Sequence, residues 1–173
     1  MTLNQFLTSV QKRAFITAKL ATDNEDDALD IVQDSMFKLA KSYPDKSEQE
    51  WPALFQRILQ NAIKDWYRKQ KVRKIMWWWQ QDKISEEELP IDYSNIPREE
   101  PEKSQQTIQT ANAINAALRK LPFRQQQAFI LRAWWEHSTE ETAAIMGCSA
   151  GSVKTHYSRA SKALANALQE VVL

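Results

Sequence analysis

The chain has 173 residues, a formal net charge of +1, two glycines and six prolines. So few glycines leave little turn chemistry for a sheet protein, and the abundant Ala, Leu, Gln, Lys and Glu residues favour helices. A single cysteine, Cys148, excludes an internal disulfide, and the two histidines add no recognisable zinc spacing. We therefore expect an all-α protein with one ordinary domain or two small ones.

No apolar run reaches the roughly 18 residues that are needed to cross a bilayer. The first residues, Met1 to Val10, lack the charged-then-apolar order of a signal peptide. The sequence therefore predicts a cytoplasmic protein with no membrane segment of its own.

The first helical periodicity runs from about Leu3 to Tyr43 and ends at Pro44. Around Glu25 to Leu39 the helical spacing predicts a buried face and an acidic outer face that includes Phe37. The buried face consists of Ala28, Ile31, Val32, Ser35, Met36 and Leu39, and the outer face of Asp27, Asp30, Gln33, Asp34 and Phe37. An apolar anchor ringed by carboxylates is typical of a surface that binds a basic protein partner. A solvated face with Phe37 tucked under a neighbour is the alternative.

The same segment spells an aspartate-rich DDxxD pattern at Asp26, Asp27 and Asp30, by which helical prenyltransferases hold magnesium diphosphate. A short match in a charged helix has little specificity, and no second such motif occurs in a helical context. The segment is also too small to enclose an isoprenoid cavity. A helical magnesium enzyme is thus the enzyme alternative.

A short polar loop, Pro44 to Glu50, precedes a second helical stretch from Trp51 towards Trp79. One face of this stretch is apolar and should be buried, and the other is cationic. Cations beside aromatic side chains are typical of a surface for a melted DNA strand, because charges hold phosphates and rings hold unstacked bases. The apolar face consists of Phe55, Ile58, Leu59, Ala62, Ile63 and Trp66, and the cationic face of Arg57, Asn61, Lys64, Arg68 and Lys71.

Three adjacent tryptophans, Trp77 to Trp79, cannot all face one side of a helix, so some should meet another surface. Prolines and acidic residues then interrupt the periodicity, and this composition predicts a flexible linker over 80–106. Helical periodicity returns and is broken at Pro122 and Gly147. We therefore predict two small helical domains, at 1–79 and 107–173.

The C-terminal part has the signature of a helix-turn-helix. Ser138 and Glu141 fit a capping box, Gly147 suits a helix end, and Ser149 fits the N-cap of the next helix. Two helices joined by about three residues with a glycine are typical of this motif. In the second helix Val153, Tyr157, Ala160 and Leu164 should pack inward, while Thr155, Ser158, Arg159 and Lys162 face outward with Lys154 and His156 at their flanks. Such a face suits a major groove, although any three-helix domain has a solvated basic face.

These motifs also resemble a known family. The run from Leu121 to Arg132, followed by Ser138 to Ser149 and Gly151 to Ala160, closely resembles region 4 of the extracytoplasmic-function sigma factors of bacterial RNA polymerase. Residues 27–38 look like sigma region 2.2, and residues 51–68 look like regions 2.3 and 2.4.

The resemblance implies a sigma factor that is not an enzyme and has no cofactor or metal. Its partners would be core RNA polymerase, promoter DNA and an anti-sigma factor. A helix-turn-helix regulator that acts without core polymerase is the alternative. By position, core polymerase would be bound by Asp30, Gln33, Asp34 and Phe37; the minus-ten element by Lys46, Ser47, Asn61, Lys64, Arg68 and Lys71; and the minus-thirty-five element by Lys154, Thr155, Ser158, Arg159 and Lys162.

Overall fold

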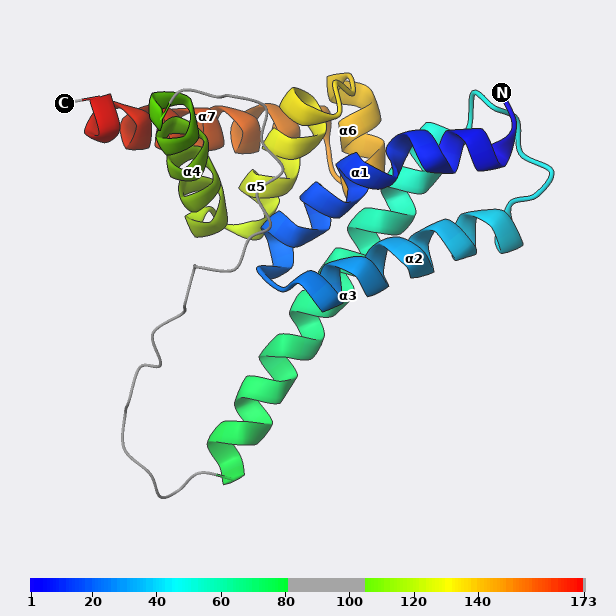
Figure 1. The fold of residues 1–173 in the computed structure, drawn as a ribbon, viewed down its shortest axis with the longest axis horizontal. Helices are drawn as coiled ribbons and strands as arrows, with labels where there is room; N and C mark the ends of the chain where they lie inside the picture. Colours follow the sequence, from blue (N-terminus) through cyan, green and yellow to red (C-terminus); the bar gives the residue numbers. More distant parts are fainter. Residues whose placement is uncertain (81–104, 173) are drawn as a thin grey trace.

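The computed structural model describes residues 1–80 and 105–172, with side chains for 1–73 and 109–169. Within these residues every regular element is helical (Figure 1), which confirms the all-α prediction. No helix in the described segments is long and apolar enough to span a membrane. The elements are α1 (Leu3–Thr22), α2 (Glu25–Ser42), α3 (Trp51–Gln80), α4 (Gln105–Lys120), α5 (Phe123–Phe129), the π-helical turn η1 (Ile130–Trp134), α6 (Thr139–Met146) and α7 (Ala150–Val172).

The predicted helical stretch from Leu3 to Tyr43 consists of two helices, α1 and α2. Asp23 ends α1 in the left-handed conformation, with a φ of 53°, a region that aspartate tolerates better than most residues. The Asn24 side chain then accepts a hydrogen bond of 2.9 Å from the Asp27 backbone N–H and caps α2. Two adjacent polar residues thus turn the chain back, so that α2 packs against α1.

Helices α1 to α3 enclose the first hydrophobic core. Leu39, Phe55 and Leu59 are fully buried, and the Phe6 ring meets Phe55 edge-on at 6.1 Å between centroids. Burying each side chain of this size contributes roughly 1.5–3 kcal/mol, so removing one leaves a costly cavity. The predicted inner faces of α2 and α3 are confirmed, with Met36, Ala62 and Trp66 at the partly exposed margin.

A second core lies among α5, η1, α6 and α7, where Ala128, Leu131 and Val153 are buried. The helix that begins with α5 widens into the π-helical turn η1. There the Trp135 backbone N–H donates to the Ile130 carbonyl oxygen, five residues earlier, at 3.0 Å. A widened turn of this kind is rare in helices and changes the direction of the residues that follow. Trp135 accordingly packs against the first core rather than the second.

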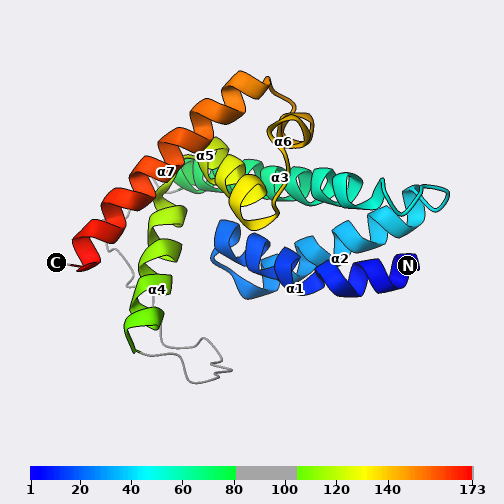
Figure 2. The same ribbon diagram turned by 90° about the horizontal axis from the view of Figure 1, so that it is seen from above.

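The two helical parts contact one another. In Figures 1 and 2 α6 lies beside the N-terminal half of α3, and contacts link these two helices as well as α1 and α4. The side chains of Phe123 and Trp135 pack against the α1–α3 core. The sequence did not predict whether the two parts pack together, because the contacts join residues far apart in the chain.

Most of the predicted linker, 81–104, lies outside the described residues. At its edges Gln80 is the last residue of α3, and 105–106 belong to α4. The side chains of Trp77 to Trp79 also lie outside the described ones, and so does the prediction that concerns them. The end of α3 that carries these residues projects beyond the other helices in Figure 1.

Candidate functional site

The outer face of α2 carries the four residues predicted to bind core polymerase. Asp30, Gln33, Asp34 and Phe37 are all exposed and follow the three- and four-residue spacing of one helix face. The Phe37 side chain is 66% exposed, and the Lys41 ammonium lies 5.6 Å from its ring centroid. The alternative in which Phe37 tucks under a neighbour is therefore wrong.

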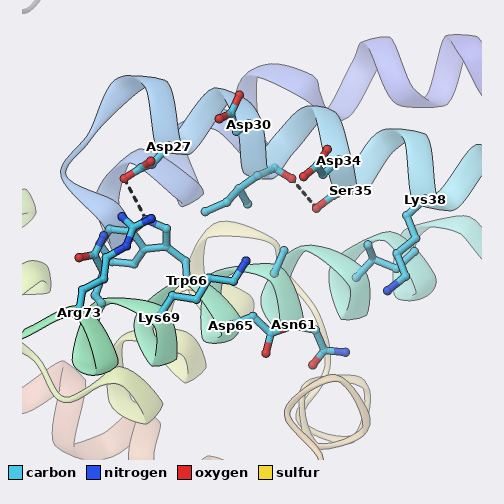
Figure 3. Close-up of a pocket in the computed structure, with 14 residues that line it drawn as sticks. Asp27, Asp30, Asp34, Ser35, Lys38, Asn61, Asp65, Trp66, Lys69 and Arg73 are labelled. Carbon is cyan, nitrogen blue, oxygen red and sulfur yellow. Dashed lines mark hydrogen bonds between the residues drawn. The ribbon is translucent and has the colours of Figure 1, made fainter. Parts of the chain in front are cut away.

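Asp27, which the periodicity placed on the same outer face, is half-buried. The Trp66 indole N–H donates to its carboxylate at 2.9 Å, so this side chain joins α2 to α3 (Figure 3). One carboxylate of the DDxxD pattern is thus committed to a tryptophan. Among the described residues, no group of three histidine, cysteine or acidic side chains is arranged to hold a metal ion.

A groove of about 450 Å³ runs between α2 and α3. Figure 3 shows its acidic wall on α2 and its mixed wall on α3, which ends in two cations. The groove therefore connects the acidic face of α2 to the cationic helix behind it. The acidic wall consists of Asp27, Asp30 and Asp34, the opposite wall includes Asn61, Asp65, Lys69 and Arg73, and the apolar lining includes Ile31, Ile58, Ala62 and Trp66.

The cationic face of α3 has the predicted composition. Asn61, Arg68 and Lys71 are exposed, and Lys64 is partly buried. Arg68 lies 3.6 Å from Asp65, and both side chains are more than 60% exposed. A surface pair of this kind contributes little stability, so Arg68 can exchange Asp65 for a phosphate at small cost.

The loop before α3 is more constrained than the sequence analysis predicted. The Lys46 ammonium pairs with Glu50 at 2.9 Å, and the Ser47 backbone N–H and hydroxyl both donate to the same carboxylate at 3.0 Å. The hydrogen bond from the Ser47 backbone N–H, and next in size the hydrogen bond from the Lys46 side chain, lower the pKa of Glu50 to about 2. Lys46 and Ser47 are thus exposed but already engaged by Glu50.

The helix-turn-helix has the predicted caps. The Ser138 hydroxyl accepts from the Glu141 N–H and the Glu141 carboxylate accepts from the Ser138 N–H, which completes the capping box. Gly147 ends α6 with a φ of 63°, and the Ser149 hydroxyl accepts from the Ser152 N–H at 3.1 Å. These contacts fix the angle between α6 and α7 at backbone level.

A further contact in the turn was not predicted. The Arg124 guanidinium of α5 donates to the Met146 carbonyl oxygen at 2.7 Å, one residue before Gly147. It satisfies a carbonyl that the end of α6 leaves without a helical partner. The sequence analysis could not predict this hydrogen bond, because Arg124 and Met146 are 22 positions apart in the chain.

The recognition helix α7 divides as predicted. Val153, Ala160 and Leu164 are buried, and the Tyr157 ring stacks on Phe129 at 5.8 Å between centroids. The Thr155 hydroxyl donates to the Gly151 carbonyl oxygen at 3.0 Å, which leaves its oxygen lone pairs as acceptors. The five predicted contact residues are all exposed, namely Lys154, Thr155, Ser158, Arg159 and Lys162.

The structure also buries polar residues that the sequence analysis did not single out. Gln56 and Gln60 of α3 and Gln126 and Gln127 of α5 are at most 5% exposed, and Thr142 of α6 is fully buried. The Gln127 amide N–H donates to the Gln60 amide oxygen at 3.1 Å. A glutamine in a helix carries no local signal of burial, because its partner comes from another part of the chain.

A helical bundle with an acidic face, a cationic helix and a helix-turn-helix defines a class of DNA-binding adaptor. The family described as Sigma-70, region 4 matches residues 111–164. The chain is 31% identical over 140 residues to RNA polymerase sigma factor SigV of Bacillus subtilis, covering 80% of this chain and 74% of that protein. It is 30% identical over 138 residues to the ECF RNA polymerase sigma factor EcfG of Rhodopseudomonas palustris, covering 79% and 68%.

Among solved structures, the sigma factor RpoE from Bartonella quintana, crystallised in complex with the anti-sigma factor NepR, is similar with a TM-score of 0.67 and 28% identity. The match covers 96% of each chain. The chain belongs to the extracytoplasmic-function sigma factors of bacterial RNA polymerase.

Proposed function

We propose that this sigma factor grips core RNA polymerase with α2, holds the opened minus-ten element on α3, and docks α7 on the minus-thirty-five element. The main support is that one chain carries three exposed surfaces of matching chemistry, one of which presents Phe37 at 66% exposure. The proposal includes two working modules, 1–79 and 107–173, and a linker at 80–106. In this proposal the polymerase, not the sigma factor, catalyses RNA synthesis. The sigma factor acts in the cytoplasm.

At the polymerase surface, Phe37 acts as the anchor. Its ring offers apolar area that only a partner can bury, and Lys41 covers one side of it. Asp30 and Asp34 have no ion pair within the described residues, so they are available to a basic partner. Carboxylates around an apolar anchor raise selectivity and the association rate more than they raise affinity.

At the minus-ten surface, α3 supplies charge along one side. Asn61, Lys64, Arg68 and Lys71 recur at three- and four-residue intervals and can follow a phosphate backbone. Trapping an unstacked base contributes on the order of 1–3 kcal/mol where a ring is available. Lys46 and Ser47 must first release Glu50, so we expect them to contribute less than the groups on α3.

At the minus-thirty-five surface, α7 presents short hydroxyl side chains beside cations. Ser158 and Arg159 can reach base edges, and Lys154 and Lys162 can neutralise phosphates. The caps at Ser138 and Gly147 hold the recognition helix at a fixed angle to α6. An anti-sigma factor is a further proposed partner, and the support is the relative that was crystallised with one.

Footprinting on a promoter library in the presence of core polymerase tests the proposal. Arg159→Ala with Lys162→Ala should remove upstream protection, and Arg68→Ala with Lys71→Ala should remove permanganate-reactive thymines near the start site. Lys12→Ala, an exposed cation of α1, is the matched control and should change neither. The assignment fails if both double variants lose the same signal or if neither loses any.

A further inference from the structure

The loop between α2 and α3 gathers three hydrogen-bond donors on one carboxylate. The Lys46 ammonium lies 2.9 Å from one oxygen of Glu50, and the Ser47 backbone N–H and hydroxyl each donate to the other oxygen at 3.0 Å. An ammonium, a hydroxyl and a backbone N–H are also the groups by which proteins hold the phosphate oxygens of DNA. We call these three donors of Lys46 and Ser47 the anion cradle.

Backbone hydrogen bonds shape this loop independently of the Glu50 side chain. The Lys46 backbone N–H donates to the Tyr43 carbonyl oxygen at 3.3 Å, and the Glu50 backbone N–H donates to the Ser47 carbonyl oxygen at 2.9 Å. The Leu54 backbone N–H donates to the Glu50 carbonyl oxygen at 3.1 Å, at the start of α3. Because these bonds join main-chain groups, the anion cradle keeps its shape when the carboxylate leaves.

Exchanging the carboxylate for another anion costs little. The side chains of Lys46 and Glu50 are each 46% exposed, and ion pairs at such positions contribute little stability because water screens them. The hydrogen bonds from the Ser47 backbone N–H and then from Lys46 hold the pKa of Glu50 at about 2, so Glu50 is an anion at neutral pH. A DNA phosphate also carries one negative charge and two free oxygens, so it can replace the carboxylate without leaving a donor unpaired.

The released carboxylate has a second cation on the same face of α3. Glu50 and Arg57 line one hollow of about 390 Å³, and they lie seven positions apart, which is about two helical turns. Arg57 is exposed and has no ion pair within the described residues. Glu50 can therefore turn toward Arg57 when a phosphate occupies the anion cradle.

We propose that the anion cradle binds a backbone phosphate of the opened minus-ten strand, and that Glu50 occupies the cradle until that strand arrives. This inference rests on the proposed function, which assigns Lys46 and Ser47 to the same strand. Glu50 then acts as a built-in competitor. A strand that reaches the loop without the contacts of α3 must displace the carboxylate unaided, so Glu50 lowers the binding of DNA that is not a promoter.

The test measures binding of a dye-labelled single-stranded DNA of mixed sequence to the full-length chain, by anisotropy at several salt concentrations. Glu50→Gln keeps the shape of the side chain but removes its charge, so the amide competes less well for the three donors. We expect a Kd about two- to fivefold lower, the factor that an exposed ion pair is worth. The plot of log Kd against log salt concentration should steepen by about 0.7, the change for one further phosphate of a single strand.

Asp45→Asn is the matched control, because it removes one negative charge from the same loop. The Asp45 side chain is exposed and has no ion pair within the described residues, so this variant should leave the salt dependence unchanged. Adding Lys46→Gln to Glu50→Gln should abolish the tighter binding and the steeper salt dependence, since the cradle then lacks its cation. Helical content and urea midpoints should stay close to those of the unmodified chain, because all three positions are exposed.

The proposal is overturned if Asp45→Asn matches Glu50→Gln, if the tighter binding survives Lys46→Gln, or if the Glu50→Gln chain does not bind the probe. Replacing chloride by inorganic phosphate at equal ionic strength separates a DNA strand from a free anion. The effect of Glu50→Gln should persist in phosphate, and its loss there would overturn the assignment to the strand.

A second measurement uses core polymerase and tests the competitor role of Glu50. Glu50→Gln should lower the ratio of promoter occupancy to scrambled-DNA occupancy by about two- to fivefold, and an unchanged ratio would contradict this role. If the unmodified chain directed no transcription from any promoter, the proposed function would fail. The single-strand binding of the Glu50, Asp45 and Lys46 variants would then still decide whether the anion cradle binds phosphate.

Discussion

Replacing Phe37 by alanine should weaken the binding of core RNA polymerase and leave the fold intact. The side chain is 66% exposed. An aromatic side chain can bury about 150–250 Å², so roughly 130 Å² of Phe37 is available to a partner, which is worth about 3 kcal/mol at about 25 cal/mol per Å². Because alanine keeps part of this area, we expect a loss of about 2–3 kcal/mol, or about 30- to 150-fold in Kd.

The assay is a titration of core polymerase into a fluorescently labelled chain, followed by anisotropy. Urea unfolding of the same variant should change by less than about 0.5 kcal/mol, because exposed positions contribute little to stability. Ile16→Ala is the matched control, since this side chain is 42% exposed on α1 and outside the acidic face. The reasoning is refuted if Phe37→Ala weakens binding no more than Ile16→Ala does.

Four further predictions concern the C-terminal part. Gly147→Ala should lower the free energy of unfolding by about 1–2 kcal/mol, because a Cβ is strained at a φ of 63° even though nothing lies within 4 Å. Gly151→Ala should instead raise it by up to about 1 kcal/mol, since its Cβ would meet only the Ser149 hydroxyl at 3.9 Å in a helix that favours alanine. Arg159→Ala should weaken upstream promoter contacts by about 1–3 kcal/mol without changing polymerase affinity, as measured by footprint titration. Burial lowers the pKa of His137 below its ordinary value of 6.5, and Glu141 opposes this shift. The unfolded chain therefore takes up the proton first, so stability is complete above about pH 6.5 and falls as the pH is lowered further. His137→Gln should reduce this fall between about pH 7.5 and about pH 5.5, as measured by urea midpoints.

Each of these outcomes has a clear opposite. Equal urea midpoints for the two glycine variants would contradict the backbone argument. A loss of polymerase affinity in Arg159→Ala would mean that this side chain of α7 contributes to polymerase binding as well as to DNA binding. An unchanged pH dependence in His137→Gln would assign the acid sensitivity to another group.

The cores and the helix-turn-helix could be predicted because their signals are local. Apolar residues such as Phe55, Leu59 and Ile63 recur at helical spacing, and this spacing is sufficient to identify a buried face. The caps at Ser138 and Gly147 depend on residues within a few positions of each other. Both kinds of signal are present in the chain before it folds.

One local signal was overlooked. Ser47 and Glu50 have the same three-residue spacing as Ser138 and Glu141, and in both pairs the serine backbone N–H donates to the glutamate carboxylate. The Ser47 hydroxyl also donates to this carboxylate, whereas the Ser138 hydroxyl accepts from the Glu141 N–H. The same spacing therefore indicated that Glu50 would engage Ser47. The break at Asp23 was also readable in principle, since an aspartate followed by an asparagine is suited to a helix end and a new N-cap.

The junction between the two parts could not be predicted in this way. Gln60 and Gln127 are separated by 67 positions, and each looks like an ordinary helix former. The same holds for Arg13, whose sequence context suggests a solvated cation. In the structure its guanidinium donates to the Trp134 carbonyl oxygen and lies 4.7 Å from the centroid of the Trp135 ring. The burial of such residues is decided by tertiary packing between distant parts of the chain, so the residues next to them in the sequence do not indicate it.

Run-off transcription with purified core polymerase on a promoter library tests the central claim most directly. The account predicts transcripts from a subset of promoters that share two spaced elements, and only when the chain is added to the core enzyme. The account is contradicted if the chain protects its own site on DNA without polymerase and supports no initiation when polymerase is present.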